Sequence, residues 1–152
     1  FDELINSGIK IDCSVFPAKR SGGGMSKYTT PLPSIVKRDS GLSIKEFPIN
    51  TLRVIGKNII YSGGGYFRLV PYFLLKILFN KSRYNMTYFH PRDFDPHQPI
   101  LDNLSLIKYF KSYVGLKTSK KKIEKLLCDF DFMTVSDADK MIDWNKVTIH
   151  RL

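Results

Sequence analysis

The sequence contains little cysteine, little histidine and no long apolar run. Only two of the 152 residues are cysteines, Cys13 and Cys128. They are too far apart for a zinc ligand pair and too few for a disulfide framework, so we expect both to be buried thiols. The longest apolar candidate, residues 66–79, is interrupted by two basic residues and a proline. The sequence therefore predicts no transmembrane segment.

Acidic residues are also scarce, since 14 Asp and Glu stand against 24 Lys and Arg, for a net charge of +10. A basic surface can hold a nucleic acid, another anionic polymer or an anionic membrane face. The lysines are spread thinly, except in residues 117–125, where they flank Ile123, Leu126 and Leu127 at helical spacing. This pattern favours the solvated face of an amphipathic helix over a binding patch, and we expect no nucleic-acid partner.

The residues that are present predict a packed α/β domain. A hydrophobic content of 43% and an aromatic content of 13% favour a folded core. Apolar spacing predicts helices at residues 1–8, 66–81, 104–113 and 119–130, with Pro71 in a first turn. It predicts strands at 9–16, 34–38, 44–49 and 86–90, and two further short strands at 51–55 and 59–61. The alternation of helices and strands favours a parallel α/β fold.

Two further segments have no strong periodicity. Residues 17–41 carry many Gly, Pro, Ser and Thr residues and are predicted to form a long loop around the short strand at 34–38. Residues 133–152 are predicted to form a separate C-terminal helical tail, in which residues 136–139 cap a short helix and Trp144 packs that helix onto a barrel. We therefore divide the chain into 1–132 and 133–152.

His90 is the strongest candidate for chemistry among the three histidines. It ends the predicted strand 86–90, directly before Pro91, where a rigid element can aim a side chain into a pocket. Three roles stay open: a general acid or base, a histidine that is merely hydrogen-bonded, or a metal ligand together with Asp93, Asp95 and His97. The intervening prolines and the lack of a zinc spacing make the metal cluster the least favoured of these.

Two other features have both functional and structural interpretations. Residues 63–65 are three glycines before a helix, which suits a phosphate cradle, close approach of the backbone to a neutral ligand, or a tight turn. A P-loop lysine and a dinucleotide fingerprint are both missing, so the last two interpretations are favoured. Asp12 lies in a strand-like alternation beside Cys13 and Ser14, and its carboxylate is either an orienting group or a loop cap.

With these residues laid out, the chain resembles the C-terminal half of a polysaccharide deacetylase of the NodB-like carbohydrate esterase family. Residues 8–17 (GIKIDCSVFP) resemble the family's Gly-aromatic-x-Tyr-Asp-Ser-Ser-x-Phe-Pro segment. Four later segments resemble the exopolysaccharide-linked branch in the right order: 46–48 (EFP), 63–72 (GGGYFRLVPY), 88–99 (YFHPRDFDPHQP) and 111–115 (KSYVG). The resemblance covers about residues 1–132.

The resemblance implies half of a distorted (β/α) barrel and an enzyme that removes N-acetyl groups from a polysaccharide with a divalent metal, zinc or similar. It implies that His90 protonates the leaving amine, that Asp12 is a second catalytic residue, and that Tyr88 and Phe89 lie near the acetyl pocket. The implied substrate contacts are Tyr88, Phe89, Gly64, Gly65, Tyr66, Arg68 and Asp93. The implied ligand is an N-acetylated polysaccharide or oligosaccharide.

The family's metal and base motifs are absent from this chain. No two aspartates are adjacent and no two histidines are four residues apart, and the family's arginine motif is also missing. These motifs lie upstream in the family, so we expect the metal ligands and the N-terminal half of the barrel to lie outside this chain, which alone is expected to be inactive. Arg92 and Asp93 also replace a Trp-Glu pair that is common in the family.

The alternative from a different functional class is a non-catalytic carbohydrate-binding or polysaccharide-assembly module. In that case Tyr61, Tyr66 and Phe67, near the glycine loop, bind sugar without cleaving it. A nucleic-acid-binding module ranks third.

Overall fold

The computed structural model describes residues 1–18, 24–25, 27–28, 30–54 and 57–152. These residues form two compact units, and each is described by itself. Unit 1 consists of Phe1–Ile59, Tyr84–Met86 and Met133–Leu152, and unit 2 consists of Ile60–Arg83 and Thr87–Phe132. The predicted tail 133–152 therefore belongs to the same unit as the first third of the chain.

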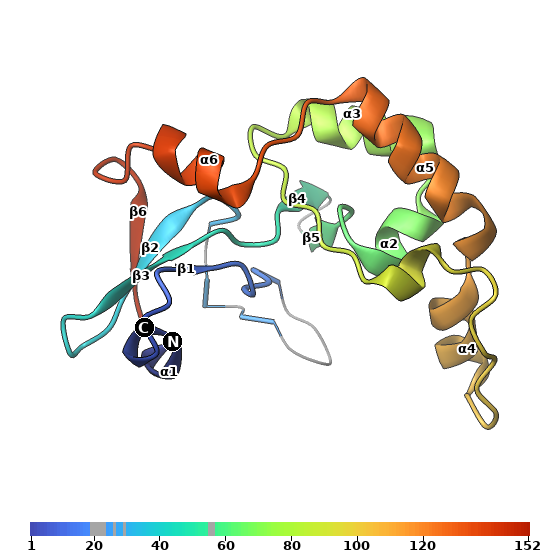
Figure 1. Cartoon of the computed structure of the whole chain (residues 1–152), viewed down its shortest axis with the longest axis horizontal. Helices are drawn as coiled ribbons and strands as arrows, with labels where there is room; N and C mark the ends of the chain where they lie inside the picture. Colours follow the sequence, from blue (N-terminus) through green and yellow to red (C-terminus); the bar gives the residue numbers. More distant parts are fainter. Residues whose placement is uncertain (19–23, 26, 29, 55–56) are drawn as a thin grey trace. The chain divides into compact units, whose positions relative to one another are not determined.

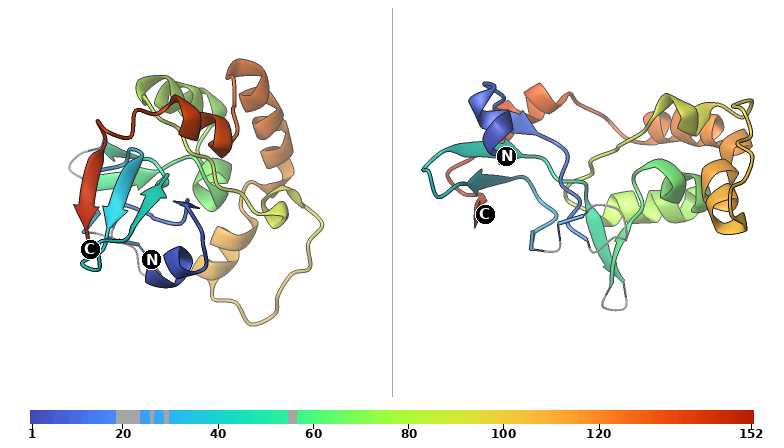
Figure 2. Two further views of the ribbon diagram at one scale, coloured as in Figure 1. Left: turned by 60° about the vertical axis from the view of Figure 1, so that its left-hand side comes forward. Right: turned by 90° about the horizontal axis from the view of Figure 1, so that it is seen from below.

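Unit 1 is built on a mixed four-stranded sheet (Figure 1). Its strands, in spatial order, are β1 (Ile11–Asp12), β3 (Ser43–Glu46), β2 (Ser34–Lys37) and β6 (Thr148–Arg151). The β1–β3 and β2–β6 pairs are parallel, whereas β2 and β3 are antiparallel. Figure 2 shows β6 beside β2 at the edge of the sheet. The sheet is thus mixed rather than purely parallel, and the half-barrel stays a prediction.

The β2–β3 hairpin follows from alternating burial and one glycine. Val36 and Ile44 are opposite each other and buried on one face, while Lys37 and Ser43 are exposed. Gly41 has a φ of +86°, a left-handed conformation that suits glycine in a tight turn. The Arg38 N–H donates to the Leu42 carbonyl over 2.8 Å and closes this turn. The predicted strands at 34–38 and 44–49 are confirmed, with the second shifted toward its N-terminus.

The two faces of the sheet are covered by different elements of unit 1. On one face, Val15, Tyr28, Val36 and Ile44 form a buried core against which α1 (Asp2–Asn6) packs through Leu4 and Ile5. On the other face lies α6 (Val135–Met141), tied to β3 by a 2.6 Å ion pair between Lys45 and Asp139. Figure 1 shows α1 and α6 on opposite sides of the sheet. Each face of the sheet therefore carries one short helix.

Residues 133–152 contain one helix and the strand β6, which periodicity did not predict. The helix starts at Thr134, whose Oγ1 accepts a hydrogen bond from the Asp137 N–H over 3.1 Å, so the predicted cap at residues 136–139 was placed too late. Trp144 packs edge-on against Phe47, with ring centroids 5.6 Å apart. Trp144 thus packs within unit 1, whereas the barrel against which it was expected to pack stays a prediction.

A second, two-stranded sheet consists of β4 (Thr51–Val54) and β5 (Lys57–Ile60), visible as the projecting pair of arrows in the right-hand view of Figure 2. These strands confirm the predictions at 51–55 and 59–61, except that Ile55 lies outside the described residues. Parts of the predicted loop 17–41 also lie outside them.

Unit 2 is mainly helical. Its helices are α2 (Gly64–Leu69), α3 (Tyr72–Lys81), the 3-10 helix η1 (Pro91–Phe94), α4 (Leu106–Tyr113) and α5 (Leu116–Asp129). Phe67, Leu75, Phe79, Leu116 and Leu126 are buried and supply its core. The predicted helices 104–113 and 119–130 are confirmed as α4 and α5, the second beginning three residues earlier than expected.

The single helix predicted at residues 66–81 is wrong, because Pro71 divides it. The chain forms α2 and α3, and Pro71 is the N-cap of α3. Proline lacks the N–H that a continuous helix needs and its ring clashes with the preceding turn, so the first helix must end before it. The prediction that Pro71 is tolerated at a helix start holds for α3.

The strand predicted at 86–90 is also wrong. Tyr88 forms a single isolated parallel bridge with Gly63, and the chain then enters η1 at Pro91. Likewise, the strand predicted at 9–16 shrinks to Ile11–Asp12. Asp12 accepts hydrogen bonds from the Cys13 N–H and the Ser14 hydroxyl, and this local turn ends the ladder.

Candidate functional site

His90 lies at the N-cap of η1, on the surface of unit 2. Its backbone is fixed on both sides: its N–H donates to Asp93 Oδ2 over 2.9 Å, and its carbonyl accepts from the Asp93 N–H over 2.9 Å. Its imidazole is exposed and contacts the ring of Tyr88 edge-on, with centroids 4.9 Å apart. The position of the residue is therefore determined by its backbone, while the ring faces solvent.

Asp93 and Arg68 form a buried ion pair beneath His90. Arg68 Nε lies 3.3 Å from Asp93 Oδ1, and both side chains are less than a tenth exposed. The guanidinium also donates to the carbonyls of Lys111, Ser112 and Val114 at distances of 2.8–3.1 Å. Burial lowers the pKa of Arg68, while the charge of Asp93 opposes this shift. The geometry gives the pair a supporting position, and the predicted sugar contacts of Arg68 and Asp93 stay predictions.

The glycine turn 63–65 makes a close backbone approach within unit 2. A Cβ atom on Gly63 would lie 2.8 Å from the Tyr88 carbonyl oxygen, so a side chain has no room there. Gly64 has a φ of +45°, and its N–H donates to the same carbonyl over 3.1 Å. Of the three interpretations of these glycines, this geometry supports a tight turn that holds the segment carrying His90.

The aromatic residues near this turn fall into two groups. Tyr61 and Phe67 are buried in the core of unit 2, so they cannot form the exposed sugar platform that the alternative function required. Phe89 also packs inward, against Phe67, with ring centroids 4.8 Å apart. Tyr66 and Tyr88 remain on the surface, with 45% and 43% of each side chain exposed.

Asp12 belongs to unit 1, where it lies next to a buried carboxyl group. In the parallel β1–β3 register, Asp12 is paired with Glu46. Glu46 is fully buried, and its Oε1 accepts a hydrogen bond from the Val15 N–H over 3.1 Å. Among the described residues, no group donates to its Oε2. Asp12 thus acts as a local cap, as one interpretation predicted, and has an acidic neighbour that was not predicted from the sequence.

Glu46 has the most informative titration in unit 1. Burial, the negative charge of Asp12 and a hydrogen bond with Asp12 raise the pKa of Glu46 to about 8, against a lowering effect of the Val15 N–H. Burial followed by the charges of Glu46 and Asp12 also raises the pKa of the Cys13 thiol to about 11. Burial raises the pKa of Tyr28 to about 12, despite its hydrogen bond with Ser34. This part of unit 1 disfavours negative charge.

A signal for Glu46 exists in the sequence. Ile44 and Glu46 are two residues apart in a predicted strand, so they share a face, and Ile44 belongs to the core. An acidic residue on the buried face of a strand is unusual and identifies a functional candidate. In the resemblance described above, Glu46 is only the first residue of the EFP segment.

The basic residues and cysteines depart in part from expectation. Most lysines of α5 are exposed, as predicted, but Lys122 reaches the C-terminus of α2 and donates to the carbonyls of Arg68 and Val70 at 2.6 and 2.8 Å. Cys128 is exposed, which corrects the prediction of a buried thiol, because it lies on the solvent side of α5. Cys13 is half-buried.

Within the described ranges, no three His, Cys, Asp or Glu side chains are grouped so that they could hold a metal ion. The described side chains therefore do not fit a divalent metal by themselves, and the predicted metal stays an expectation that requires ligands from elsewhere. Among the helices of the described residues, none is long and apolar enough to span a membrane.

Comparison with known protein families identifies the family of this chain. Residues 13–140 match the family described as Domain of unknown function (DUF3473), a domain found at the C-terminal end of polysaccharide deacetylase family proteins. No curated protein and no solved structure matches the chain. The matched segment covers most of the sequence and includes Glu46, the glycine turn and His90, and the chain belongs to the DUF3473 family.

Proposed function

We propose that this chain is the C-terminal part of a metal-dependent polysaccharide N-deacetylase, in which His90 is the general acid. The observation that carries the proposal is the state of His90: a backbone fixed by Asp93 and by the Gly63–Tyr88 bridge, with an imidazole left exposed for a substrate. Membership of a family found with polysaccharide deacetylases supports it.

The chemistry requires a proton at the leaving nitrogen. Attack of water on the N-acetyl carbonyl gives a tetrahedral intermediate, whose C–N bond breaks to release acetate and a free amine. The nitrogen must gain a proton as this bond breaks, and a protonated imidazole can supply it near neutral pH. A bound metal would polarise the carbonyl oxygen in the complete enzyme. The described residues of this chain would bind and protonate the substrate.

The supporting residues keep the imidazole in place for this transfer. The buried Arg68–Asp93 pair holds the His90 backbone, and the Tyr88 ring contacts the edge of the imidazole. A fixed general acid needs such support, since a displacement of about 1 Å can cost about a hundredfold in rate. Tyr88 and Tyr66 are the predicted sugar contacts that have exposed rings.

The test is acetate release from N-acetylglucosamine oligomers by the complete protein, with and without added zinc, in wild-type and His90→Ala forms. We expect metal-dependent release that falls by about 10²- to 10⁴-fold in the variant. His97→Ala is the matched control, because His97 is also exposed in the same segment and should leave the rate unchanged. Near-wild-type activity of His90→Ala would remove His90 from the mechanism.

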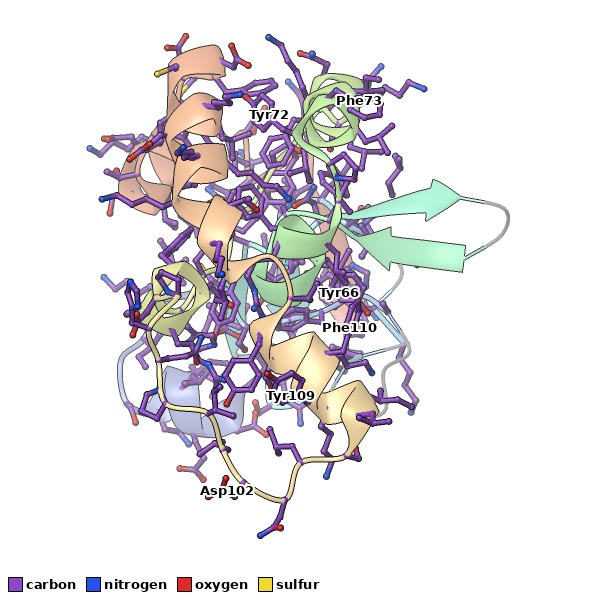
Figure 3. All side chains as sticks on the ribbon, turned by 90° about the vertical axis from the view of Figure 1, so that its right-hand side faces the viewer. Tyr66, Tyr72, Phe73, Asp102, Tyr109 and Phe110 are labelled. Atoms are coloured by element: carbon purple, nitrogen blue, oxygen red, sulfur yellow. The ribbon has the colours of Figure 1, made fainter. Side chains whose placement is uncertain are left out.

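A second candidate function, a carbohydrate-binding module, is favoured by exposed aromatic residues on unit 2. Tyr66, Tyr109 and Phe110 are 43–55% exposed. The N-terminus of α2 meets the C-terminus of α4, since a Cβ on Gly65 would lie 3.7 Å from the Lys111 carbonyl oxygen. Figure 3 shows Tyr66 and Phe110 on the same side of this unit. Exposed rings of this kind can stack on sugar rings.

Binding and catalysis are separated by measuring both on the same oligomers. Binding that is lost in Tyr66→Ala and Phe110→Ala, with no acetate released under any metal, would support the binding module. Phe73→Ala is the matched control, since Phe73 of α3 is 64% exposed on a different helix.

A further inference from the structure

We propose that Glu46 carries a proton at neutral pH and donates it in a hydrogen bond to the Asp12 carboxylate, which makes Glu46 the positioning residue of Asp12. A catalytic role of Asp12 is what the family resemblance implies, and it rests on the proposed function. The acid–carboxylate pair itself rests only on the geometry of unit 1.

The sheet brings the two carboxyl groups together. Asp12 on β1 is the register partner of Glu46 on β3, and the Phe47 N–H donates to the Asp12 carbonyl over 2.9 Å, which fixes the strands at this point. Side chains of register partners lie on the same face and contact each other. On the other side, β2 places Ser34 opposite Glu46, and Ser34 is already hydrogen-bonded to Tyr28. Of the two register partners of Glu46, Asp12 is therefore the one available to bind its carboxyl group.

The hydrogen bonds of Glu46 indicate which of its two carboxyl oxygens carries the proton. Glu46 Oε1 is occupied by the Val15 N–H, whereas Oε2 is buried and receives no hydrogen bond from the described residues. The carboxylate oxygens of Asp12 accept from the Cys13 N–H and the Ser14 hydroxyl, and each can accept a second bond. A proton on Glu46 Oε2 turns this unpaired acceptor into a donor to Asp12. Both groups are then satisfied.

The surroundings contain no described cation that would stabilise an ionised Glu46 instead. The titratable groups coupled to it are Asp12 and Cys13 beside β1, Tyr28 in the loop and Tyr84 in the segment 84–86, and all of them are neutral or negative. Lys45 is adjacent in sequence, but its ammonium is paired with Asp139 on the other face of the sheet. A buried, uncompensated acid in such surroundings keeps its proton.

The first test is a titration of the whole chain, with the Glu46 carboxyl carbon followed by NMR. We expect a midpoint near 8 and a downward shift of that midpoint in Asp12→Asn, because the substitution removes the neighbouring negative charge. A Glu46 midpoint near 4.5, or one that is unchanged in Asp12→Asn, would overturn the pair.

The second test asks what the pair does in the reaction. Glu46→Gln keeps an N–H donor for Asp12 and an oxygen for the Val15 N–H, so we expect it to retain activity at pH 7. In the wild type we expect activity to decline above pH 8, where Glu46 loses its proton, and we expect this decline to be absent in Glu46→Gln. Glu46→Ala removes the donor, and activity should fall by about tenfold to a hundredfold. Equal loss in both variants, or an unchanged pH profile in Glu46→Gln, would refute the positioning role.

The two tests also separate this inference from the proposed function. If His90→Ala remains active, the deacetylase mechanism fails, whereas the NMR midpoint of Glu46 is unaffected. If the NMR midpoint is ordinary while His90→Ala is inactive, the acid–carboxylate pair fails and the proposed function survives.

Discussion

The two units bury charge in opposite ways. In unit 2, Arg68 is buried together with Asp93 and three backbone carbonyls, so its charge and most of its donors are used. In unit 1, Glu46 is buried next to another acid, with one backbone donor. Removing a charge from water is costly unless partners replace the water. Unit 2 supplies those partners, and unit 1 does not.

This difference distinguishes buried charges that support the structure from a buried acid that is a candidate for chemistry. A compensated buried pair such as Arg68–Asp93 is the usual way to fix a backbone, here that of His90. An uncompensated buried acid reduces stability at neutral pH, and such groups are concentrated at functional sites. We therefore infer that Arg68 and Asp93 support the backbone of His90, and that Glu46 holds a proton.

The largest expected effect on stability is that of Arg68→Ala. The variant leaves Asp93 buried without its partner, which typically costs about 3–5 kcal/mol. The single tryptophan, Trp144, lies in unit 1, so its fluorescence reports on that unit, while most helices counted by circular dichroism belong to unit 2. We expect the helical signal of the variant to be lost at a lower urea concentration than in the wild type, and the midpoint of the Trp144 fluorescence transition to be unchanged.

A simultaneous shift of both transitions would show that the units unfold together and would break the comparison. Lys140→Ala is the control, because its ion pair with Asp137 is exposed and its loss should have no measurable effect.

The next effect is a dependence of unit 1 on pH. The pKa of Glu46 is raised from 4.5 to about 8, so the folded state binds the extra proton between these values. The stabilisation is fully present below pH 4.5 and is lost as the pH rises through 8, by up to about 1.4 kcal/mol per pH unit. Burial lowers the pKa of His150 from 6.5, which has the opposite effect below that value. The clearest window is therefore pH 6.5–8.

Urea unfolding followed by Trp144 fluorescence measures this slope. Glu46→Gln should flatten it within the window, whereas Glu3→Gln should leave it as in the wild type. A wild-type slope that survives in Glu46→Gln must come from another group.

A smaller effect is expected at the glycine turn of unit 2. Gly63→Ala places a Cβ 2.8 Å from the Tyr88 carbonyl oxygen and should cost about 1–3 kcal/mol, since the backbone has to move. Gly65→Ala is the matched control, because its nearest atoms lie at 3.7 Å and alanine favours the helix by about 0.5–1 kcal/mol. The midpoint of thermal unfolding, followed by the helical circular-dichroism signal, should fall in Gly63→Ala and rise in Gly65→Ala. Equal shifts would contradict the close approach.

The smallest effect concerns the start of α6 in unit 1. Thr134→Ala removes the side-chain acceptor of the Asp137 N–H and should cost about 1 kcal/mol. Ser136→Ala lies within the helix and should cost nothing, although the sequence suggested the cap there. A larger loss of stability in Ser136→Ala than in Thr134→Ala would instead place the cap at residues 136–139, as the sequence suggested.

Local periodicity predicted most elements but not their interruptions. Periodicity predicts a segment correctly where that segment has one apolar face. This is the case for the strands at 34–38 and 44–49 and for the helices at 104–113 and 119–130. The division of residues 66–81 at Pro71 could have been predicted, since proline removes a helical hydrogen bond. The strand expected at 86–90 could not be rejected in this way. A strand requires a partner, and Tyr88 meets one only at Gly63.

The sequence by itself determined the basic composition, the amphipathic helices and the resemblance that made His90 a candidate. Only the tertiary structure decided that Tyr61 and Phe67 are core residues, that Arg68 lies beneath His90, and that Glu46 is paired with Asp12. Asp12 and Glu46 are distant in the sequence, and strand pairing brings them together. Periodicity describes one element at a time, whereas burial and the resulting shift in protonation depend on what the neighbouring elements supply.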